Sequence, residues 1–505
     1  MKRCPECRRD YYDDTLLYCL DDGNALLEGP AAGGEPATAF LSETPDSAGG
    51  FTGYTQEVEP KTAILQPPAP ADCNSRVDPI PGSTIPEAET AIFTAQELSP
   101  TLNYGDRRFR IAVIPFEFRG PDIELTNLAE GLSEDIVTGL SRFTYIRVIG
   151  DSHALKTSNS EQGLHSRARE TEPHYVVQGK VRQTGNVIRV GVRLYEAATS
   201  TNIWAENYDH ERSDDDLLRM QEQIVSCLVS TIADPYGILP RNMRLTVKDM
   251  RPDQMSAYDA LLRSFVYADR VTAEEHGEAK AGLERAVSQE PQNSDCWAML
   301  SIMLADEYGH GLGADHSVLG MALKAAQRAV DSNPSNHRAQ QALSWVLFLR
   351  KEFAAARIAA EKAVSLNPMD GCTAAYAGQV LAYSGDWQKG CSMIERAIPW
   401  NPGHPGWYWY ALFLEAYRRA DFERAVQFAV KMNLPGVPLG YVALAAAFAQ
   451  FGDSASAANA VQDLLELRPD YAGLAETELG KWWDTATVGC LIEGLRKAGL
   501  EIPSR

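Results

Sequence analysis

The residues closest to a recognisable chemistry are three cysteines at the start of the chain. Residues 4–7 (CPEC) and 19–22 (CLDD) form two short elements separated by eleven residues, a spacing at which paired C-x-x-C elements bind tetrahedral zinc. An aspartate stands where the second element would have its second cysteine, and a carboxylate oxygen is also an accepted zinc ligand. The expected ligands are therefore Cys4, Cys7, Cys19 and Asp22, with Asp21 as the alternative fourth ligand.

Such a site would be structural. A module of residues 1–28 has too small a core to fold alone, so one zinc ion would supply folding free energy rather than activate a substrate. The alternative interpretation is three free thiols in a disordered tail.

Other residues that could act chemically do not form a catalytic pattern. Glu134 and Asp135 are adjacent on a predicted helix, where they point in different directions and cannot jointly flank one scissile bond. Ion pairs or hydrogen bonds, with Arg142 or Arg182 as candidates, are their expected role. The sequence has no G-x-x-x-x-G-K-[ST], G-x-S-x-G or H-E-x-x-H motif, and its nine histidines have no partners at metal-ligand spacing. We expect no catalytic residues, and no cofactor besides the zinc.

Composition limits the classes of partner. The 505 residues carry a formal net charge of −21, which repels a polyanion, so nucleic acid is an unfavourable partner for the chain as a whole. The start of the chain lacks the apolar run of a secretory signal, and no stretch approaches the ~20 apolar residues that span a bilayer. Nine dispersed cysteines fit metal binding and buried thiols better than a disulfide framework. We therefore expect a cytoplasmic protein.

The elements that would position these residues change sharply along the chain. Residues 29–107 are rich in Gly, Pro, Ala and Thr and have no hydrophobic period, which predicts a flexible linker. Residues 108–235 predict an α+β domain with an amphipathic helix over 125–140, a strand over 145–149, three close strands over 174–183, 187–196 and 201–209, and a final helix. Trp204 is expected in its core.

Past residue 253 the sequence repeats itself. The dipeptides Asn333-Pro334, Asn367-Pro368 and Asn401-Pro402 are 34 residues apart, the period of tetratricopeptide (TPR) repeats. Small residues recur twelve and five positions before each proline, where they let paired helices approach closely. We expect about six repeats over 254–472, an insertion over 306–313 that lengthens one inter-helix loop, and a capping helix over 473–505.

Two resemblances follow from particular residues. The blocks 131–136 (GLSEDI), 175–179 (YVVQG) and 204–209 (WAENYD) resemble the TolB-like amino-terminal domain, which in its family commonly precedes TPR repeats and follows a class III adenylate cyclase or a winged-helix domain. Both of those domains are absent from this sequence. Residues 4–7 and 18–23 resemble the zinc-ribbon heads of bacterial signalling proteins.

The TPR register implies a concave groove lined by the first helix of each repeat, suited to a peptide or a partner's helix. The groove residues it implies are Arg338, Gln341, Trp345, Phe348 and Gln379. Packing of Trp345 and Phe348 between helices is the open alternative.

The expected architecture is thus multidomain: a zinc knuckle, a disordered linker, a TolB-like α+β domain and an all-α TPR solenoid. The expected function is a non-catalytic bacterial signalling or assembly scaffold that binds a protein through its repeats. One alternative is a transcriptional regulator whose locally basic zinc head contacts DNA. Another is a regulatory component associated with a nucleotide cyclase.

Overall fold

The computed structural model describes residues 108–149, 173–212, 217–267, 273–312, 317–434 and 436–503, and the backbone of residues 2–3, 10–11 and 27–28. The chain divides into two units, Met1–Ala71 and Asp72–Arg505. In the first unit, three two-residue strands form an antiparallel sheet in the order β2-β1-β3: β1 (Lys2–Arg3), β2 (Asp10–Tyr11) and β3 (Leu27–Glu28). The proposed zinc ligands Cys4, Cys7, Cys19 and Asp22, the alternative Asp21, and the linker lie outside the described residues.

The second unit begins with a small mixed sheet in the order β6-β4-β7-β8-β9, with β5 also paired to β7. Strand β4 runs parallel to β6 and β7, whereas β7, β8 and β9 form an antiparallel meander. The strands are β4 (Phe109–Val113), β5 (Glu117–Phe118), β6 (Ile146–Ile149), β7 (Tyr175–Thr184), β8 (Val187–Glu196) and β9 (Asn202–Glu211). The bounds of β6 to β9 lie within two residues of the four strands predicted from the sequence. In β8 the alternating residues Ile188 and Val190 are fully buried on one face of the sheet, which is the pattern on which the prediction of that strand rests.

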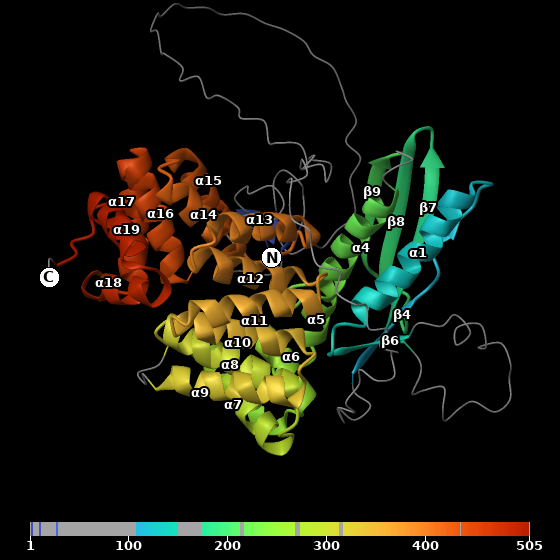
Figure 1. The fold of residues 1–505 in the computed structure, drawn as a ribbon, viewed down its shortest axis with the longest axis horizontal. Helices are drawn as coiled ribbons and strands as arrows, with labels where there is room; N and C mark the ends of the chain where they lie inside the picture. Colours follow the sequence, from blue (N-terminus) through green and yellow to red (C-terminus); the bar gives the residue numbers. More distant parts are fainter. Residues whose placement is uncertain are drawn as a thin grey trace, which may run out of the picture. The chain divides into compact units, whose positions relative to one another are not determined.

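Helices α1 (Ile123–Leu140) and α4 (Leu217–Ala233) cover that face of the sheet (Figure 1). Asp122 caps α1 by accepting hydrogen bonds from the backbone N–H groups of Glu124 and Leu125. Arg212, just after β9, contacts the same carboxylate at 2.5 Å. The cap therefore also ties the start of α1 to the end of the sheet.

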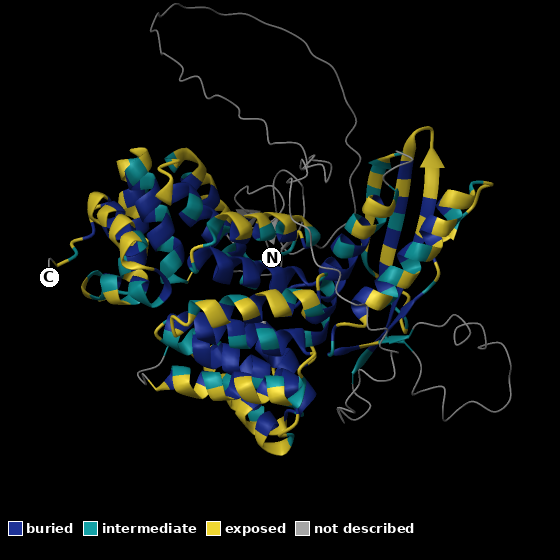
Figure 2. Cartoon of the chain, in the orientation of Figure 1, coloured by how far each residue is buried: buried dark blue, intermediate teal, exposed yellow. Residues whose placement is uncertain are grey.

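The remainder of the second unit is a helical TPR-like solenoid. Its helices pack in consecutive antiparallel pairs whose inner sides are buried and whose outer sides are exposed (Figures 1 and 2). A linking segment contains α5 (Ile238–Arg244) and the short helix η3 (Pro252–Gln254). The six pairs are α6 (Ala257–Tyr267) with α7 (Ala273–Gln289), α8 (Ser294–Gly309) with α9 (Val318–Ser332), α10 (His337–Leu349) with α11 (Phe353–Leu366), α12 (Gly371–Tyr383) with α13 (Trp387–Ala397), α14 (Trp409–Arg418) with α15 (Phe422–Met432), and α16 (Pro438–Phe451) with α17 (Ser454–Leu467).

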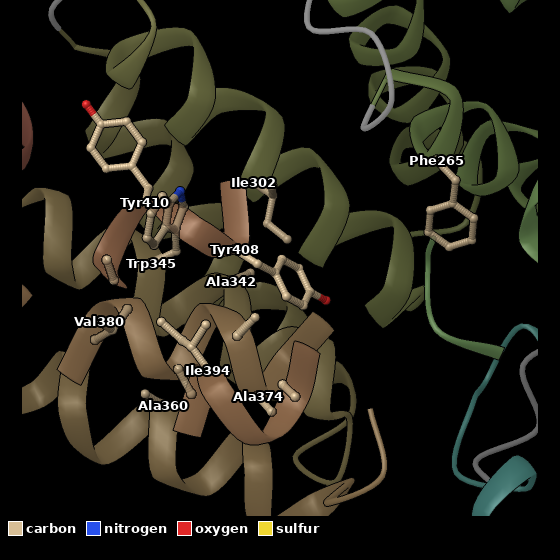
Figure 3. Packing of buried hydrophobic residues seen from close by; sticks show 14 of the residues in the cluster. Phe265, Ile302, Ala342, Trp345, Ala360, Ala374, Val380, Ile394, Tyr408 and Tyr410 are labelled. Carbon is tan, nitrogen blue, oxygen red and sulfur yellow. The ribbon is translucent and has the colours of Figure 1, made fainter. Parts of the chain in front are cut away.

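The predicted small residues lie where paired helices come closest. Gly390 on α13 is the clearest case, since a Cβ atom there would stand 2.4 Å from the carbonyl oxygen of Gly378 on α12. The alanines one repeat earlier, Ala356 and Ala363, are buried. Figure 3 shows how Ala342, Ala360 and other buried residues fill the space between helices. The repeat register therefore identifies real packing positions.

Two details differ from the sequence expectation. Residues 306–309, expected in a loop, continue α8 to Gly309 and so bring Asp306 onto the helix. The single capping helix expected over 473–505 is two helices, α18 (Tyr471–Trp482) and α19 (Thr485–Lys497). The break follows from Asp484, whose side chain caps a new helix by accepting from the N–H of Thr487.

No helix in the described part of the chain is both long enough and apolar enough to cross a membrane.

Candidate functional site

The first helices of the repeats surround a cavity of about 150 Å³. It is lined by α6, α8, α10, α12 and α14, by Pro235 and Tyr236 after α4, and by Trp482 and Trp483 at the end of α18. Ten aromatic side chains line it: Tyr236, Phe265, Tyr267, Trp345, Tyr376, Tyr383, Trp407, Tyr410, Trp482 and Trp483. Its polar lining residues include Ser264, Asp306, His310, Arg338, Gln341 and Gln379. The cavity is thus predominantly apolar with a few converging polar groups, the usual character of a ligand site.

Four of the five groove residues expected from the sequence line this cavity: Arg338, Gln341, Trp345 and Gln379. Phe348 does not. It is fully buried between helices, where its ring stacks on Trp345 at 5.5 Å and meets Phe353 and Tyr383. For Phe348 the packing alternative therefore describes the structure, whereas Trp345 both packs and faces the cavity.

The C-terminal cap changes the character of the expected groove. The ring of Trp482 lies 5.7 Å from Trp345 on α10 and 5.4 Å from His310 at the end of α8. Trp483 stacks on Tyr410 at 5.2 Å. The Nζ of Lys351, after α10, donates to the carbonyl oxygen of Lys481 at 2.8 Å. Because α18 contacts the array at several repeats, the concave face forms a covered cavity rather than an open trough, and the groove residues are at most 6% exposed.

Arg338 is the most unusual group in the cavity. Its guanidinium carbon lies 4.9 Å from the ring centres of both Tyr145 and Phe265, so two aromatic rings hold it by cation–π contacts. The side chain is only 3% exposed, yet among the described residues Nε and Nη2 have no hydrogen-bond partner. A buried guanidinium normally satisfies its five donors, so this arginine has unused hydrogen-bonding capacity.

Burial shifts the pKa values of the other ionisable groups of the cavity in the direction that favours their neutral forms. Burial raises the pKa of Asp306 to about 7, while interactions with Trp345 and Tyr267 partly oppose that rise. Burial lowers the pKa of His310 to about 4, with Lys481 adding to the effect. Burial also raises the pKa of Cys372 well above its usual value. Arg338 therefore supplies the dominant fixed charge of the lining.

A second buried cluster, which we call the junction network, joins the sheet domain to the solenoid. Asp234 lies just after α4. Its two carboxylate oxygens lie 2.9 and 3.0 Å from the Asn401 side-chain nitrogen, which donates to them, and Oδ2 also accepts a hydrogen bond from Ser230 Oγ at 3.0 Å. Ser230 Oγ accepts in turn from the N–H of Gly371 at 3.2 Å. A Cβ at Gly371 would stand 2.6 Å from that oxygen, so only glycine lets α12 start so close to α4.

Asp370, the N-cap of α12, belongs to the same network. Its side chain accepts from the backbone N–H groups of Cys372 and Thr373, and lies 2.9 Å from both His337 Nε2 and Thr373 Oγ1. These contacts, led by His337, outweigh desolvation and lower the pKa of Asp370. Desolvation and the neighbouring Asp370 instead raise the pKa of Asp234 to about 7. Both carboxyl groups are hydrogen-bonded on both oxygens.

The carboxylate pair considered from the sequence has a structural role at Asp135, which accepts a hydrogen bond from Gln221 Nε2 at 2.6 Å and so ties α1 to α4. Arg142 instead donates to the carbonyl oxygen of Leu366 at 3.2 Å. Trp204, expected in the core, is only partly buried and packs against the core from β9. Among the described residues no group of three or more His, Cys, Asp or Glu side chains could hold a metal ion, and the zinc ligand set stays a prediction.

The fold and the cavity together define a TPR-like helical solenoid attached to a small α/β domain. Comparison with protein families matches residues 107–227 to the second domain of HilA/YgeH-like transcriptional regulators. A curated relative, "Putative adenylate cyclase 3" of Rhizobium meliloti (strain 1021), is 30% identical over 241 residues, which are 47% of this chain and 40% of the relative. The chain therefore spans well under two thirds of that protein's length.

Among solved structures, one similar chain is the TPR protein YrrB, with 14% identity and a TM-score of 0.26, covering 37% of this chain and 93% of that one. Another is Pseudomonas aeruginosa pilF, with 17% identity and a TM-score of 0.30, covering 45% of this chain and 94% of that one. A chain of the APC/C hetero-tetramer Cut9–Hcn1 is also similar, with 14% identity and a TM-score of 0.38, covering 56% of each chain. At these identities and scores the likeness does not extend to function.

Proposed function

We propose that this protein is a non-catalytic regulatory protein whose TPR-like solenoid binds a protein partner in its concave cavity. The observation that carries the proposal is the convergence of Arg338, Gln341, Trp345 and Gln379 on one aromatic cavity. These residues come from two repeats, and the repeat register alone selected them. A cavity of this character is the default site for a ligand or for the anchoring side chain of a partner.

The α/β domain acts in this proposal as a rigid mount for the solenoid. The junction network buries Asp234 of the α/β segment against Asn401 of the array, and Thr231 adds a hydrogen bond of 2.8 Å to the carbonyl oxygen of Trp400. A ligand in the cavity would also meet Tyr236, which directly follows α4. A ligand bound in the cavity would therefore contact a residue next to the α/β domain. We assign that domain to the TolB-like class on its sequence blocks, and zinc to the head of the chain on its cysteine spacing.

The proposal is tested by capturing partners with the full chain, because a fragment beginning at 236 would cut the junction network. The cavity variant is Arg338→Ala with Gln379→Ala. Its matched control is Arg328→Ala with Phe451→Ala, two exposed positions on the same array. We expect one protein to be recovered by the wild type and the control and lost from the cavity variant. Equal recovery by all three baits would refute binding in the cavity.

A second candidate function has one observation in its favour. The 30% identity over 241 residues to "Putative adenylate cyclase 3" supports a regulatory component associated with a nucleotide cyclase. Recovery of a cyclase by the wild-type bait would identify it. The zinc head as a DNA contact is a further hypothesis, tested by whether residues 1–30 bind DNA with a strong salt dependence.

A further inference from the structure

We propose that the cavity binds an aromatic ring that carries or adjoins a carboxylate, either as a free small acid or as the last residue of a peptide. The inference rests on the proposed use of the cavity for binding and specifies the chemistry that the cavity would take. Three observations carry it: the size of the cavity, its aromatic lining and the unsatisfied guanidinium of Arg338.

Size limits the ligand to about one ring. A cavity near 150 Å³ is the size at which a protein interior accommodates a benzene-sized molecule. Because Trp482 and Trp483 of the cap cover the concave face, a whole helix of a partner does not fit among these residues. The portion of any ligand that enters is therefore small and compact.

The lining selects a flat apolar group. Trp345, Tyr376 and Trp407 form a continuous set of contacts, with ring centres 5.2 and 4.6 Å apart, and Trp483 stacks on Tyr410 beside it. Aromatic rings prefer offset or edge-to-face partners at such separations. A ligand ring would extend these contacts without requiring new polar groups.

Charge selects an anion next to that ring. Arg338 carries the positive charge of its guanidinium, whereas burial holds His310, with its pKa lowered to about 4, neutral near pH 7 and leaves Asp306, with its pKa raised to about 7, only about half ionised there. Asp370 interacts with Arg338 electrostatically, but its own oxygens are occupied by His337, Thr373 and two backbone N–H groups. The rings of Tyr145 and Phe265 lie against the guanidinium, and its Nε and Nη2 have no hydrogen-bond partner among the described residues, so a carboxylate next to them would find free donors.

The test compares matched acids and amides on the full-length protein. The small probes are phenylacetate and phenylacetamide, and the peptide probes are Gly-Gly-Gly-Phe with a free carboxylate and with a terminal amide. Binding is followed by calorimetry and by tryptophan fluorescence, to which four lining residues contribute among the nine tryptophans of the chain. We expect the acid of at least one pair to bind about tenfold or more tightly than its amide, because a charge-assisted hydrogen bond is lost in the amide. Phenylacetate binding alone would indicate a free metabolite, and binding of the peptide acid alone a chain terminus.

Variants assign the effect to Arg338. Arg338→Gln should remove the preference for acid over amide, and Arg338→Lys should keep part of it, with unchanged melting temperatures showing that both fold. The wild-type comparison stands even if a variant does not fold. Equal binding of acid and amide, an intact preference in Arg338→Gln, or no saturable binding by any probe up to about 10 mM would each overturn the inference. If a partner protein is still captured through the cavity in that case, the proposed function survives without it; if the acids bind and no protein is captured, the inference survives and the protein-binding function fails.

Discussion

The junction network and the polar groups of the cavity are both buried in the same solenoid, but they differ in how completely their hydrogen bonds are satisfied. In the junction network, Asp234 and Asp370 receive hydrogen bonds on every carboxylate oxygen. In the cavity, Arg338 has two buried nitrogens with no hydrogen-bond partner among the described residues. Buried polar groups in native proteins are rarely left unsatisfied, so each exception needs an explanation.

This difference separates structure from binding. A network whose hydrogen bonds are all satisfied stabilises the fold but has no free donor or acceptor for a ligand. A network with unsatisfied donors can bind a ligand, but those donors lower the stability of the unliganded protein. The two regions share α10, because His337 contacts Asp370 while the next residue, Arg338, faces the cavity. Adjacent residues of one helix thus serve different ends.

The largest expected effect comes from breaking the complete region. Asp370→Ala removes the cap of α12 and leaves the buried His337 Nε2 without its Asp370 partner, whereas the Thr373 hydroxyl keeps Gln341 as an acceptor, so we expect a loss of about 3–5 kcal/mol in the free energy of unfolding. Urea denaturation followed by circular dichroism measures it. The matched control is Asp453→Ala, which removes an N-cap of the same type from α17 and should lower the free energy of unfolding clearly less, because among the described residues that cap belongs to no buried network. Equal losses would mean that the network adds nothing beyond an ordinary cap.

A pH series sharpens the comparison at the next level of effect. Asp234 and Asp306 have folded-state pKa values raised to about 7 from an ordinary 3.8, so the folded protein holds protons that the unfolded chain has released. Their stabilising contribution is complete below about pH 4 and is lost as the pH rises through about 7. Because His310, with its pKa lowered to about 4, acts in the opposite direction below about pH 6.5, the informative range is pH 6.5 to 8.5.

Over that range the free energy of unfolding should fall in the wild type and fall less in Asp306→Asn. A carboxyl with a folded-state pKa of about 7 can lose at most about 0.8 kcal/mol between these pH values, because most of its contribution is already lost below pH 6.5, so we expect the two curves to diverge by about 0.5–1 kcal/mol. Chemical denaturation at matched ionic strength measures both proteins. Parallel curves would show that Asp306 titrates as an ordinary aspartate.

The sequence was informative about these regions to different degrees, and the reason is physical. The 34-residue period located Arg338, Gln341, Trp345 and Gln379, because a repeat places equivalent residues on the same face of successive helices. Extending the same step would also have paired Tyr376 with Tyr410, which are 34 residues apart and both line the cavity. The alternation within residues 187–196 likewise located the buried face of β8.

Other features depend on contacts that no local pattern contains. Trp482 and Trp483 belong to the cap, outside the repeat register, and they reach the cavity because α18 contacts α8. The sequence predicts that residues 306–313 are an insertion in an inter-helix loop, yet α8 continues to Gly309, which packs directly under the Trp482 ring. One hydrogen-bond donor to Asp234, the Asn401 amide, is 167 residues away in the sequence. Such pairings arise from tertiary packing and not from propensity.

The incomplete region should respond weakly when its charge is removed. Arg338→Met takes away a buried guanidinium that has unsatisfied donors, which is favourable, and two cation–π contacts, which is unfavourable. We expect these effects to offset, leaving the free energy of unfolding within about 1 kcal/mol of wild type while binding of the aromatic acid is lost. Thermal denaturation and calorimetry on the same sample measure both. A destabilisation as large as that of Asp370→Ala would show that Arg338 is structural, and the contrast between the two regions would fail.

The smallest expected effect tests whether a polar pair with satisfied hydrogen bonds stabilises the fold when it is exposed to solvent. Arg189 on β8 and Asp209 on β9 form a two-point ion pair with distances of 2.6 and 2.5 Å, but their side chains are 56% and 45% exposed. Water and salt screen such a pair, so Arg189→Ala should lower the free energy of unfolding only slightly, and by still less in 0.5 M NaCl. Denaturation at low and high salt measures it, with Arg328→Ala, an exposed arginine of the solenoid, as the matched control. A loss comparable to that of Asp370→Ala would mean that satisfied hydrogen bonds alone determine how much a polar cluster stabilises the fold. A small loss would mean that the junction network stabilises the fold because its hydrogen-bonded groups are also shielded from water.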